Sequence, residues 1–266
     1  MIAYFPKPCF IPVAISDCKL NCKHCMGRYL KQMLKLETEK ELLKFGLSFK
    51  GNGILVSGGF DEKGRLINLE KMLPVIEKLK DRIYIAIHPG FVNEELADEM
   101  AKACDIAFVD LPAKNAIKNV LKLNATVEDY FENMEKLMEA GIKISPHITV
   151  GLNYGKIEEW ELLDKLKNYK IEKLVLNFIV PTAKTSFENV RINEEEAIEF
   201  VKEAKNKVKN VVIGCMRPRN LDINLIEAGI KEIANPSKKA LEYAKEKGII
   251  VEAKPYCCGI KIFKRC

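Results

Sequence analysis

The feature that most constrains the fold is a regular alternation of short apolar runs and longer amphipathic stretches along all 266 residues. The apolar runs predict β-strands at 10–16, 53–56, 83–87, 106–110, 144–150, 174–179 and 211–214, with a shorter eighth at 232–234. Apolar residues at helical spacing predict helices over 69–79, 127–140, 158–166 and 197–208, and a last helix between Ser237 and Gly248. Seven or eight strand–helix repeats without a linker indicate an α/β fold with one parallel sheet.

Repeats of this kind predict a (β/α) barrel of TIM type, full or nearly full, over residues 1–252. Residues 253–266 have no helical pattern and are predicted to form a C-terminal tail that carries cysteines. In a barrel the right-handed crossovers place the carboxyl ends of all strands on one face, where binding sites form. The same periodicity also fits an open doubly wound sheet.

The overall composition argues against several classes of protein. The 43 basic and 37 acidic residues leave a net charge of only +6, which is typical of a solvated surface rather than of nucleic-acid binding. No run of 18 apolar residues is present, so no membrane span is expected. Pro6 and Pro8 lie where a signal peptide needs an unbroken apolar core. A chain of this length needs no disulfides, so its nine cysteines favour a reducing cytoplasm.

Three cysteines follow the first predicted strand in the run Cys18-Lys-Leu-Asn-Cys22-Lys-His-Cys25. Spacings of four and three let their side chains face one point from a single short loop. Thiolates are the ligands that iron–sulfur clusters prefer, and three of them on a four-iron cluster leave one iron open to a small molecule. The alternatives are scattered core cysteines or a structural zinc site, which usually has four ligands in two paired motifs.

This cysteine pattern resembles that of the radical S-adenosylmethionine (SAM) superfamily. The resemblance implies a [4Fe-4S] cluster on Cys18, Cys22 and Cys25, with SAM chelated to the open iron through its amino and carboxylate groups. It also implies that an electron from a low-potential donor cleaves SAM to methionine and a 5′-deoxyadenosyl radical. His24 takes the position where family members usually carry an aromatic ring beside adenine, so a stacking contact or hydrogen bond to adenine is expected there.

Two further strand ends carry candidates for binding SAM. The second strand ends in Ser57-Gly58-Gly59-Phe60, which resembles the superfamily's Gly-Gly-Glu segment that binds the SAM amino group through backbone oxygens. Phe60 replaces the acid, so the resemblance implies backbone contacts only, and an ordinary tight turn is the alternative. Asp110 ends the fourth strand, where its carboxylate can accept hydrogen bonds from two ribose hydroxyls or can cap a helix.

The fifth strand, Ser145-Pro-His147-Ile148-Thr-Val150-Gly151, resembles the family's Gly-x-Ile-x-Gly-x-x-Glu segment, whose backbone pairs with adenine. Ile148 and Gly151 match that segment, whereas its first Gly and its final Glu are missing. His147 lies at a pleated position that can point into the barrel, toward a substrate or as a core histidine.

Other candidate substrate-binding groups lie at two more strand ends. His88 ends the third strand, at the predicted barrel mouth, where it can contact SAM, the substrate or neither. Arg217 and Arg219 follow the seventh strand beside Cys215 and can bind a carboxylate or phosphate, with a surface salt bridge as the alternative.

The sixth strand resembles one branch of the superfamily. The run Asn177-Phe178-Ile-Val-Pro181-Thr-Ala-Lys-Thr185 is similar to the Asn-Phe-x-x-Pro-x-x-Gly-Thr segment of biotin synthases. Biotin synthase also holds a two-iron cluster deep in its barrel on cysteines of middle strands, yet Ser145 stands at such a position in this chain. Biotin is therefore not the expected product.

Cysteines gather instead near the C-terminus. Cys257, Cys258 and Cys266 lie in the predicted tail, and neighbouring cysteines rarely serve a core because their side chains point apart. One interpretation is a second iron–sulfur cluster on these three residues, with Cys9 or Cys215 as a further ligand. Zinc binding or coincidence is the other.

A barrel with an extra cluster and no biotin pattern resembles the two-component lipoyl synthases. That resemblance implies sulfur insertion into an octanoyl chain on a lysine of a lipoyl carrier protein, with a partner radical SAM component. One alternative is a radical SAM enzyme that rearranges a carbon skeleton without sulfur transfer. The other is a non-catalytic iron–sulfur module that partners a true enzyme.

Overall fold

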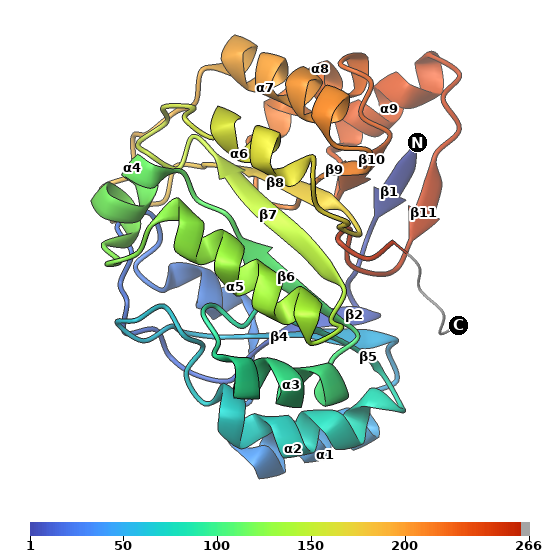
Figure 1. Cartoon of the computed structure of the whole chain (residues 1–266). Coiled ribbons are helices and arrows are strands. Elements are labelled where there is room, and N and C mark those ends of the chain that lie inside the picture. Colours follow the sequence, from blue (N-terminus) through green and yellow to red (C-terminus); the bar gives the residue numbers. More distant parts are fainter. Residues whose placement is uncertain (262–266) are drawn as a thin grey trace.

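The computed structural model describes residues 1–261, which form one sheet with helices packed around it (Figure 1). The eleven strands of this part pair in parallel, in the order β11-β1-β10-β9-β8-β7-β6-β5-β4-β2-β3. Eight of them match the eight predicted strands and form the barrel. They are β2 (Phe10–Ala14), β4 (Gly53–Ser57), β5 (Tyr84–Ile87), β6 (Ile106–Asp110), β7 (Ile144–Val150), β8 (Leu174–Phe178), β9 (Val211–Ile213) and β10 (Glu232–Ala234).

Three short strands extend the sheet beyond these eight. β1 (Ile2–Tyr4) pairs with β10 and with β11 (Glu252–Lys254), and β3 (Leu34–Lys35) pairs with β2. The sheet of residues 1–261 ends at β11 on one side and at β3 on the other. The predicted barrel is therefore confirmed in a nearly full, open form, because β2 and β10 do not pair with each other.

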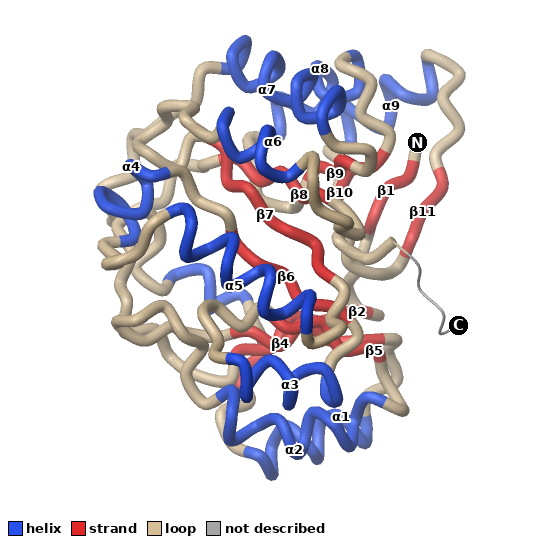
Figure 2. The backbone as a smooth tube through the Cα atoms, in the orientation of Figure 1, coloured by secondary structure: helices blue, strands red, loops and turns tan. Residues whose placement is uncertain are grey.

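Helices cover the outer face of this sheet (Figure 2). The predicted helices are present as α2 (Leu69–Lys80), α5 (Val127–Glu139), α6 (Trp160–Leu166), α7 (Glu194–Lys207) and α9 (Lys238–Glu246). The structure adds α1 (Glu39–Ser48), α3 (Glu94–Ala103), α8 (Asp222–Glu227) and the short α4 (Lys114–Ala116). α7 begins three residues before its predicted start, because its first turn is Glu194-Glu195-Glu196 and carries no apolar signal.

Side chains alternate between the two faces of each barrel strand. In β6, Ala107 and Val109 belong to the large apolar cluster that also contains the buried faces of the helices. Ile106 and Phe108 belong to a second cluster, inside the barrel. Asp110 follows in the same inward register at the carboxyl end of β6, so it faces the barrel mouth.

The C-terminal chain turns into the barrel at the end opposite the mouth. Ile260 is completely buried and packs against Phe10, Tyr84 and Phe108. Phe10 and Tyr84 are the first residues of β2 and β5, and Figure 1 shows β11, the last strand, lying beside β1. Residues 256–260 thus close the amino-terminal end of the barrel, and we call them the floor segment.

This chain end is continuous with the barrel. The predicted domain boundary between residues 252 and 253 falls inside β11, because pairing with β1 carries the sheet through Lys254. Beyond β11, Cys258 is buried against Tyr4, Val175 and Val212. The described part of the predicted tail is therefore core rather than appendage.

Candidate active site at the mouth of the barrel

The cysteine loop leaves β2 at the barrel mouth, as its place after the first strand predicted. Its three cysteines, Cys18, Cys22 and Cys25, sit on a tight turn in which the Cys22 carbonyl accepts the Cys25 N–H at 3.2 Å. The Phe60 carbonyl, just past β4, accepts the Lys19 N–H at 3.0 Å. This bond ties the loop to the neighbouring strand end.

The two glycines after β4 let the cysteine loop approach closely. A Cβ on Gly59 would lie 2.2 Å from the carbonyl carbon of Asp17 and 2.2 Å from Cα of Cys18, both backbone atoms. A Cβ on Gly58 would lie 2.8 Å from the Ser16 hydroxyl, which itself donates to the Gly59 carbonyl at 3.1 Å. Gly58 and Gly59 thus have a clear role in seating the loop, and their contact with the SAM amino group stays a prediction.

The three thiols lie within electrostatic reach of one another. Burial raises the pKa of Cys22 and raises that of Cys25 to about 11, and charge on the neighbouring loop cysteines adds to both shifts. Two buried nitrogen atoms of the same loop, His24 Nδ1 and Arg28 Nε, have no hydrogen-bond partner among residues 1–261. Such orphaned polar atoms are costly unless a bound group satisfies them.

This donor set fits an iron–sulfur cluster. Within residues 1–261, no three Cys, His, Asp or Glu side chains stand close enough around one point to bind a single metal ion. A multi-iron cluster takes thiolates from further apart than one tetrahedral ion does. The donor chemistry of Cys18, Cys22 and Cys25, three sulfur atoms on one loop, fits the thiolate ligation that iron–sulfur clusters use.

All three histidines of the chain gather around Asp110 at the mouth. His88 Nε2 lies 3.0 Å from Asp110 Oδ2. Burial alone would raise the pKa of Asp110, but the charge and hydrogen bond of His88, helped by His147 and His24, lower it overall. Burial alone would lower the pKa of His88, and the same contact with Asp110 raises it. The next helix, α4, has Ala113 at its N-cap position, so Asp110 is not its cap.

His147 points into the barrel between Asp110 and the floor segment. Its ring lies 4.9 Å from that of Phe108 and 6.5 Å from that of His88, measured between centroids. Burial lowers the pKa of His147 to about 4, so the ring is neutral at pH 7. Nδ1 lies 3.1 Å from the Ser145 carbonyl, and a proton on Nδ1 leaves the Nε2 lone pair for the barrel interior.

His24 lies buried in the cysteine loop, beside the rings of Tyr29 and Phe187. Burial lowers the pKa of His24 to about 4, against the opposing charge of Asp110, so its ring is also neutral at pH 7. A neutral ring among aromatic side chains suits the predicted contact with adenine, which stays a prediction.

A buried acid, Glu159, supports the turn after β7, and the sequence analysis did not identify this residue. Ile148 is completely buried on the helix side of β7, and the contact of its backbone with SAM stays a prediction. Gly151 ends the strand with φ +76°, and its N–H and that of Leu152 donate to the carboxylate of Glu159 at 3.2 and 3.3 Å. Burial raises the pKa of Glu159 to about 7. No spacing rule identifies this acid, because the chain folds back between Gly151 and Glu159.

The two arginines after β9, Arg217 and Arg219, use their N–H groups in hydrogen bonds within the protein. Arg217 Nε lies 2.6 Å from Asp222 Oδ1, and both side chains are almost completely buried. Arg217 also donates to the carbonyls of Gly214 and Ala234, and Arg219 donates to that of Cys215. These contacts argue for a structural role, and substrate binding by Arg217 and Arg219 stays a prediction without support here.

The remaining cysteines divide between the floor and the outside. Cys257 and Cys258 lie in the floor segment, where the hydrogen bond from Cys258 is the largest effect and lowers the pKa of Cys257. Cys215 lies just past β9 and is exposed. Burial, and then charge on Cys257, raises the pKa of Cys215. Cys266 lies outside the described residues.

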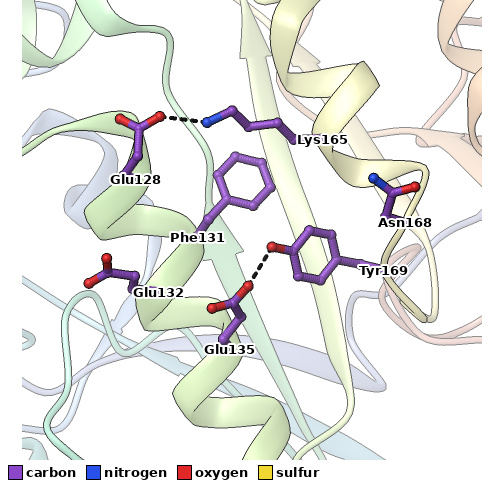
Figure 3. A pocket seen from close by; sticks show the side chains of 7 residues that line it. All are labelled: Glu128, Phe131, Glu132, Glu135, Lys165, Asn168 and Tyr169. Atoms are coloured by element: carbon purple, nitrogen blue, oxygen red, sulfur yellow. Dashed lines mark hydrogen bonds and ion pairs between the residues drawn. The ribbon is translucent and has the colours of Figure 1, made fainter.

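A separate hollow of about 370 Å³ lies on the outside of the barrel, between α5 and the end of α6 (Figure 3). Its polar groups pair with each other: Lys165 with Glu128, and the Tyr169 hydroxyl with Glu135, each at 2.5 Å. It contains none of the residues singled out above.

A (β/α) barrel with a three-cysteine loop at its mouth defines a class of barrel enzymes built around an iron–sulfur cluster. Comparison with known families sharpens this class. The family described as "Radical SAM superfamily" matches residues 13–166. The chain belongs to the radical SAM superfamily, and membership implies a [4Fe-4S] cluster and SAM as cofactors.

Among curated proteins the chain is similar to biotin synthases. It is 22% identical over 199 residues to that of Caldicellulosiruptor bescii, covering 70% of this chain and 58% of that protein. It is 27% identical over 207 residues to that of Buchnera aphidicola subsp. Schizaphis graminum, covering 72% of this chain and 58% of that protein. The biotin-synthase-like branch is thus confirmed, although the chain spans only about 58% of the length of these relatives.

Solved structures share the fold. Methylornithine synthase superposes with a TM-score of 0.60 at 14% identity, over 95% of this chain and 83% of that one. SuiB of Streptococcus suis bound to S-adenosylmethionine superposes with a TM-score of 0.59 at 15% identity, over 80% of this chain and 51% of that one. In the part of the chain that the structure describes, no helix is long and apolar enough to cross a membrane.

Proposed function

We propose that this radical SAM enzyme activates an unactivated C–H bond and inserts sulfur there, in the manner of a lipoyl synthase. The expected substrate is an octanoyl chain on a lysine of a lipoyl carrier protein. The observation that carries the proposal is that the barrel has a three-cysteine loop at its mouth and further cysteines, Cys257 and Cys258, in the floor segment. The similarity to biotin synthases, whose name denotes sulfur chemistry on carbon, supports it.

The chemistry needs a radical source and a sulfur source that both lie inside the barrel. When bound, the cluster and SAM supply a 5′-deoxyadenosyl radical by taking one electron from a low-potential donor, and this radical removes a hydrogen atom from the substrate. The sulfur source must lie close to that substrate carbon. Because the floor segment packs across the amino-terminal end of the barrel, the mouth is the proposed entrance for the substrate.

Residues at the mouth have proposed roles in holding the cofactors. Cys18, Cys22 and Cys25 hold the cluster. SAM contacts the side chains of His24 and Asp110. It also contacts the backbone of Gly58 and Gly59 and of the stretch from Ile148 to Gly151.

Histidines inside the mouth have proposed roles toward the substrate. His88 and His147 line the chamber beside Asp110, 6.5 Å apart between ring centroids. A neutral His147 with a lone pair on Nε2 can accept the N–H of an acylated lysine amide. His88, held by Asp110, gives this wall a fixed shape.

The proposed setting is a reducing cytoplasm, with a low-potential electron donor, a carrier protein and a partner radical SAM component. The sulfur source proposed from the sequence is a second cluster on Cys257, Cys258 and Cys266, of which the first two lie in the floor segment.

The test is anaerobic reconstitution with iron and sulfide, followed by incubation with SAM, a strong reductant and an octanoyl-lysyl peptide. We expect 5′-deoxyadenosine together with peptide that has gained sulfur in place of hydrogen, detected by mass spectrometry. The partner component is supplied in a parallel reaction. Abundant 5′-deoxyadenosine without any sulfur in the peptide under either condition would favour rearrangement chemistry over sulfur insertion.

A further inference from the structure

A hollow lined by lysines lies at the amino-terminal end of the barrel. Its volume is about 320 Å³, near the lower end of the range of about 300–1,000 Å³ that is usual for small-molecule sites. Its walls are the end of α6 with the turn before β8, the end of α7 with the turn before β9, and Lys261, which follows the floor segment. Turns that precede strands lie at the amino-terminal face of a barrel, so this hollow is on the side opposite the mouth.

The lining of this hollow is strongly positive. Five of its ten residues are lysines and none is an acid, and we call it the lysine hollow after Lys167, Lys170, Lys207, Lys209 and Lys261. The chain as a whole is nearly balanced, with 43 basic and 37 acidic residues, so this is a local excess of positive charge. Like charges around one hollow repel one another, and an anion placed among them relieves that repulsion.

Ion pairs within the protein account for only two of these lysines. Lys207 Nζ lies 2.7 Å from Asp164 Oδ1 and 3.1 Å from Glu203 Oε1. Lys167 Nζ lies 3.9 Å from the same Asp164 oxygen. The other three form no ion pair with an acid among residues 1–261: Lys170, Lys209 and Lys261. Each wall of the hollow therefore contributes an ammonium group that is available to a ligand.

Hydrogen bonds and packing fix the three walls relative to one another. The Leu174 N–H donates to the Asn210 carbonyl at 2.8 Å, and Asn210 Nδ2 donates to the Glu172 carbonyl at 3.2 Å. These two bonds join the turn before β8 to the turn before β9. Lys261 directly follows Ile260, which is completely buried. The backbone positions that carry the lysines are thus set before any ligand arrives, which lowers the cost of binding.

We propose that the lysine hollow binds a linear polyphosphate, either inorganic triphosphate or the triphosphate end of a nucleotide. Lysine ammonium groups are compact point charges that bind phosphate oxygens well. A chain of phosphates presents negative charge to several sides at once, as the three walls require. A nucleic-acid strand needs cations along an extended groove, whereas these surround one small hollow.

This inference goes beyond the proposed function, because the lysine hollow contains none of the residues assigned to the cluster, SAM or the substrate. A polyphosphate bound there would join the turns before β8 and β9 to the end of the floor segment. It would also stabilise the folded protein by mass action, since the unfolded chain does not assemble the hollow.

The test is calorimetric titration of the full, reconstituted chain with inorganic triphosphate, in magnesium-free buffer and with SAM present in excess so that the mouth is occupied. We expect one site per chain, with an affinity that falls as salt is added. The variant Lys170→Gln/Lys209→Gln/Lys261→Gln should bind triphosphate about tenfold more weakly, because charge-assisted hydrogen bonds to phosphate are lost.

A matched variant controls for the change in net charge. Lys40→Gln/Lys44→Gln/Lys71→Gln removes three exposed lysines from α1 and α2, which lie far from α6 and α7 in Figure 1, and should keep the affinity of the wild type. Circular dichroism checks that both variants are folded. No binding of triphosphate by the wild type, or equal affinities in the two triple variants, would overturn the inference.

Parallel titrations distinguish the sources of the phosphate chain. An affinity for ATP no higher than that for triphosphate identifies the free phosphate chain as the ligand, and a higher affinity for ATP identifies a nucleotide. A short single-stranded RNA is the third titrant. If it binds more tightly than both and loses this binding in the variant of the lysine hollow, the surface belongs to nucleic acid and the proposal of a small ligand is refuted.

Discussion

The mouth and the floor of the barrel both carry cysteines, but they are built in opposite ways. At the mouth, Cys18, Cys22 and Cys25 lie within one loop, and Gly59 lets that loop rest on the next strand end. At the floor, Cys257 and Cys258 reach the barrel core only because the C-terminal chain folds back. A site built within one loop can be recognised from its spacing in the sequence, whereas a site built when a distant segment folds back cannot.

The largest effect is expected at the mouth. Replacing any one of Cys18, Cys22 and Cys25 by Ala should abolish 5′-deoxyadenosine formation, because a two-thiolate loop cannot hold the cluster that cleaves SAM. Product is measured by chromatography after incubation with SAM and reductant. The comparison variant Cys104→Ala should keep its activity. If a variant with all three of these cysteines replaced still cleaves SAM, the barrel mouth is not the cluster site.

The support beneath the loop gives the next effect. In Gly59→Ala the new Cβ would stand 2.2 Å from backbone atoms of Asp17 and Cys18, so the loop must move. We expect this variant to lose most of the loop cluster while any floor cluster persists, as read from iron content. Gly141→Ala, where the added Cβ meets nothing within 4 Å, is the control for replacing a glycine without a steric clash, even though Gly141 has a positive φ that an alanine strains. Equal iron in the two variants would contradict the seating role of Gly59.

The floor can be tested by stability alone. Ile260→Ala should lower the free energy of unfolding by about 2–5 kcal/mol, because it leaves a cavity among Phe10, Tyr84 and Phe108. Ile250→Ala, at a residue 86% exposed, should change it little. Urea unfolding of both variants gives the comparison. Similar small effects would show that the floor segment does not close the barrel.

A smaller effect is expected for SAM binding at Asp110. Asp110→Asn should weaken SAM binding by roughly 1–3 kcal/mol if the carboxylate holds the ribose without help. The affinity is measured by calorimetry on reconstituted protein. An unchanged affinity would assign Asp110 to the mouth wall, as the partner of His88.

The smallest effect is a dependence of stability on pH. Asp110 raises the pKa of His88 in the folded protein, so the stabilising contact is complete below the unfolded value, about 6.5, and is lost as pH rises through the folded value. The difference in unfolding free energy between wild type and Asp110→Asn should therefore be larger at about pH 5.5 than at pH 8. The His88 ring signals should titrate at lower pH in the variant, because burial then acts unopposed. A difference that does not change with pH would contradict the His88–Asp110 pairing.

Local periodicity was sufficient to predict the eight barrel strands, including the short β10, since each needs only a few apolar residues between turns, but it missed β1, β3 and β11 at the sheet edges. It failed at the start of α7, where three glutamates precede the apolar stripe. The β7 segment lacks the final Glu of the family's motif, yet Glu159 brings a carboxylate to the Gly151 turn from further along the chain. Sequence patterns report neighbours along the chain, whereas a contact of this kind joins two positions that the fold brings together.

By itself, the sequence determined the strand–helix repeats and the three-cysteine loop after the first of them, because both follow from spacings of a few residues, and it left a closed barrel and an open doubly wound sheet as alternatives. Only the tertiary structure decided that three histidines converge on Asp110, that Arg217 is buried with Asp222, and that the chain end forms the floor. The physical reason is that burial and charge pairing depend on which distant segments the closed sheet brings together. The inward face of a barrel is assembled from every strand at once, so no single stretch of sequence reveals it.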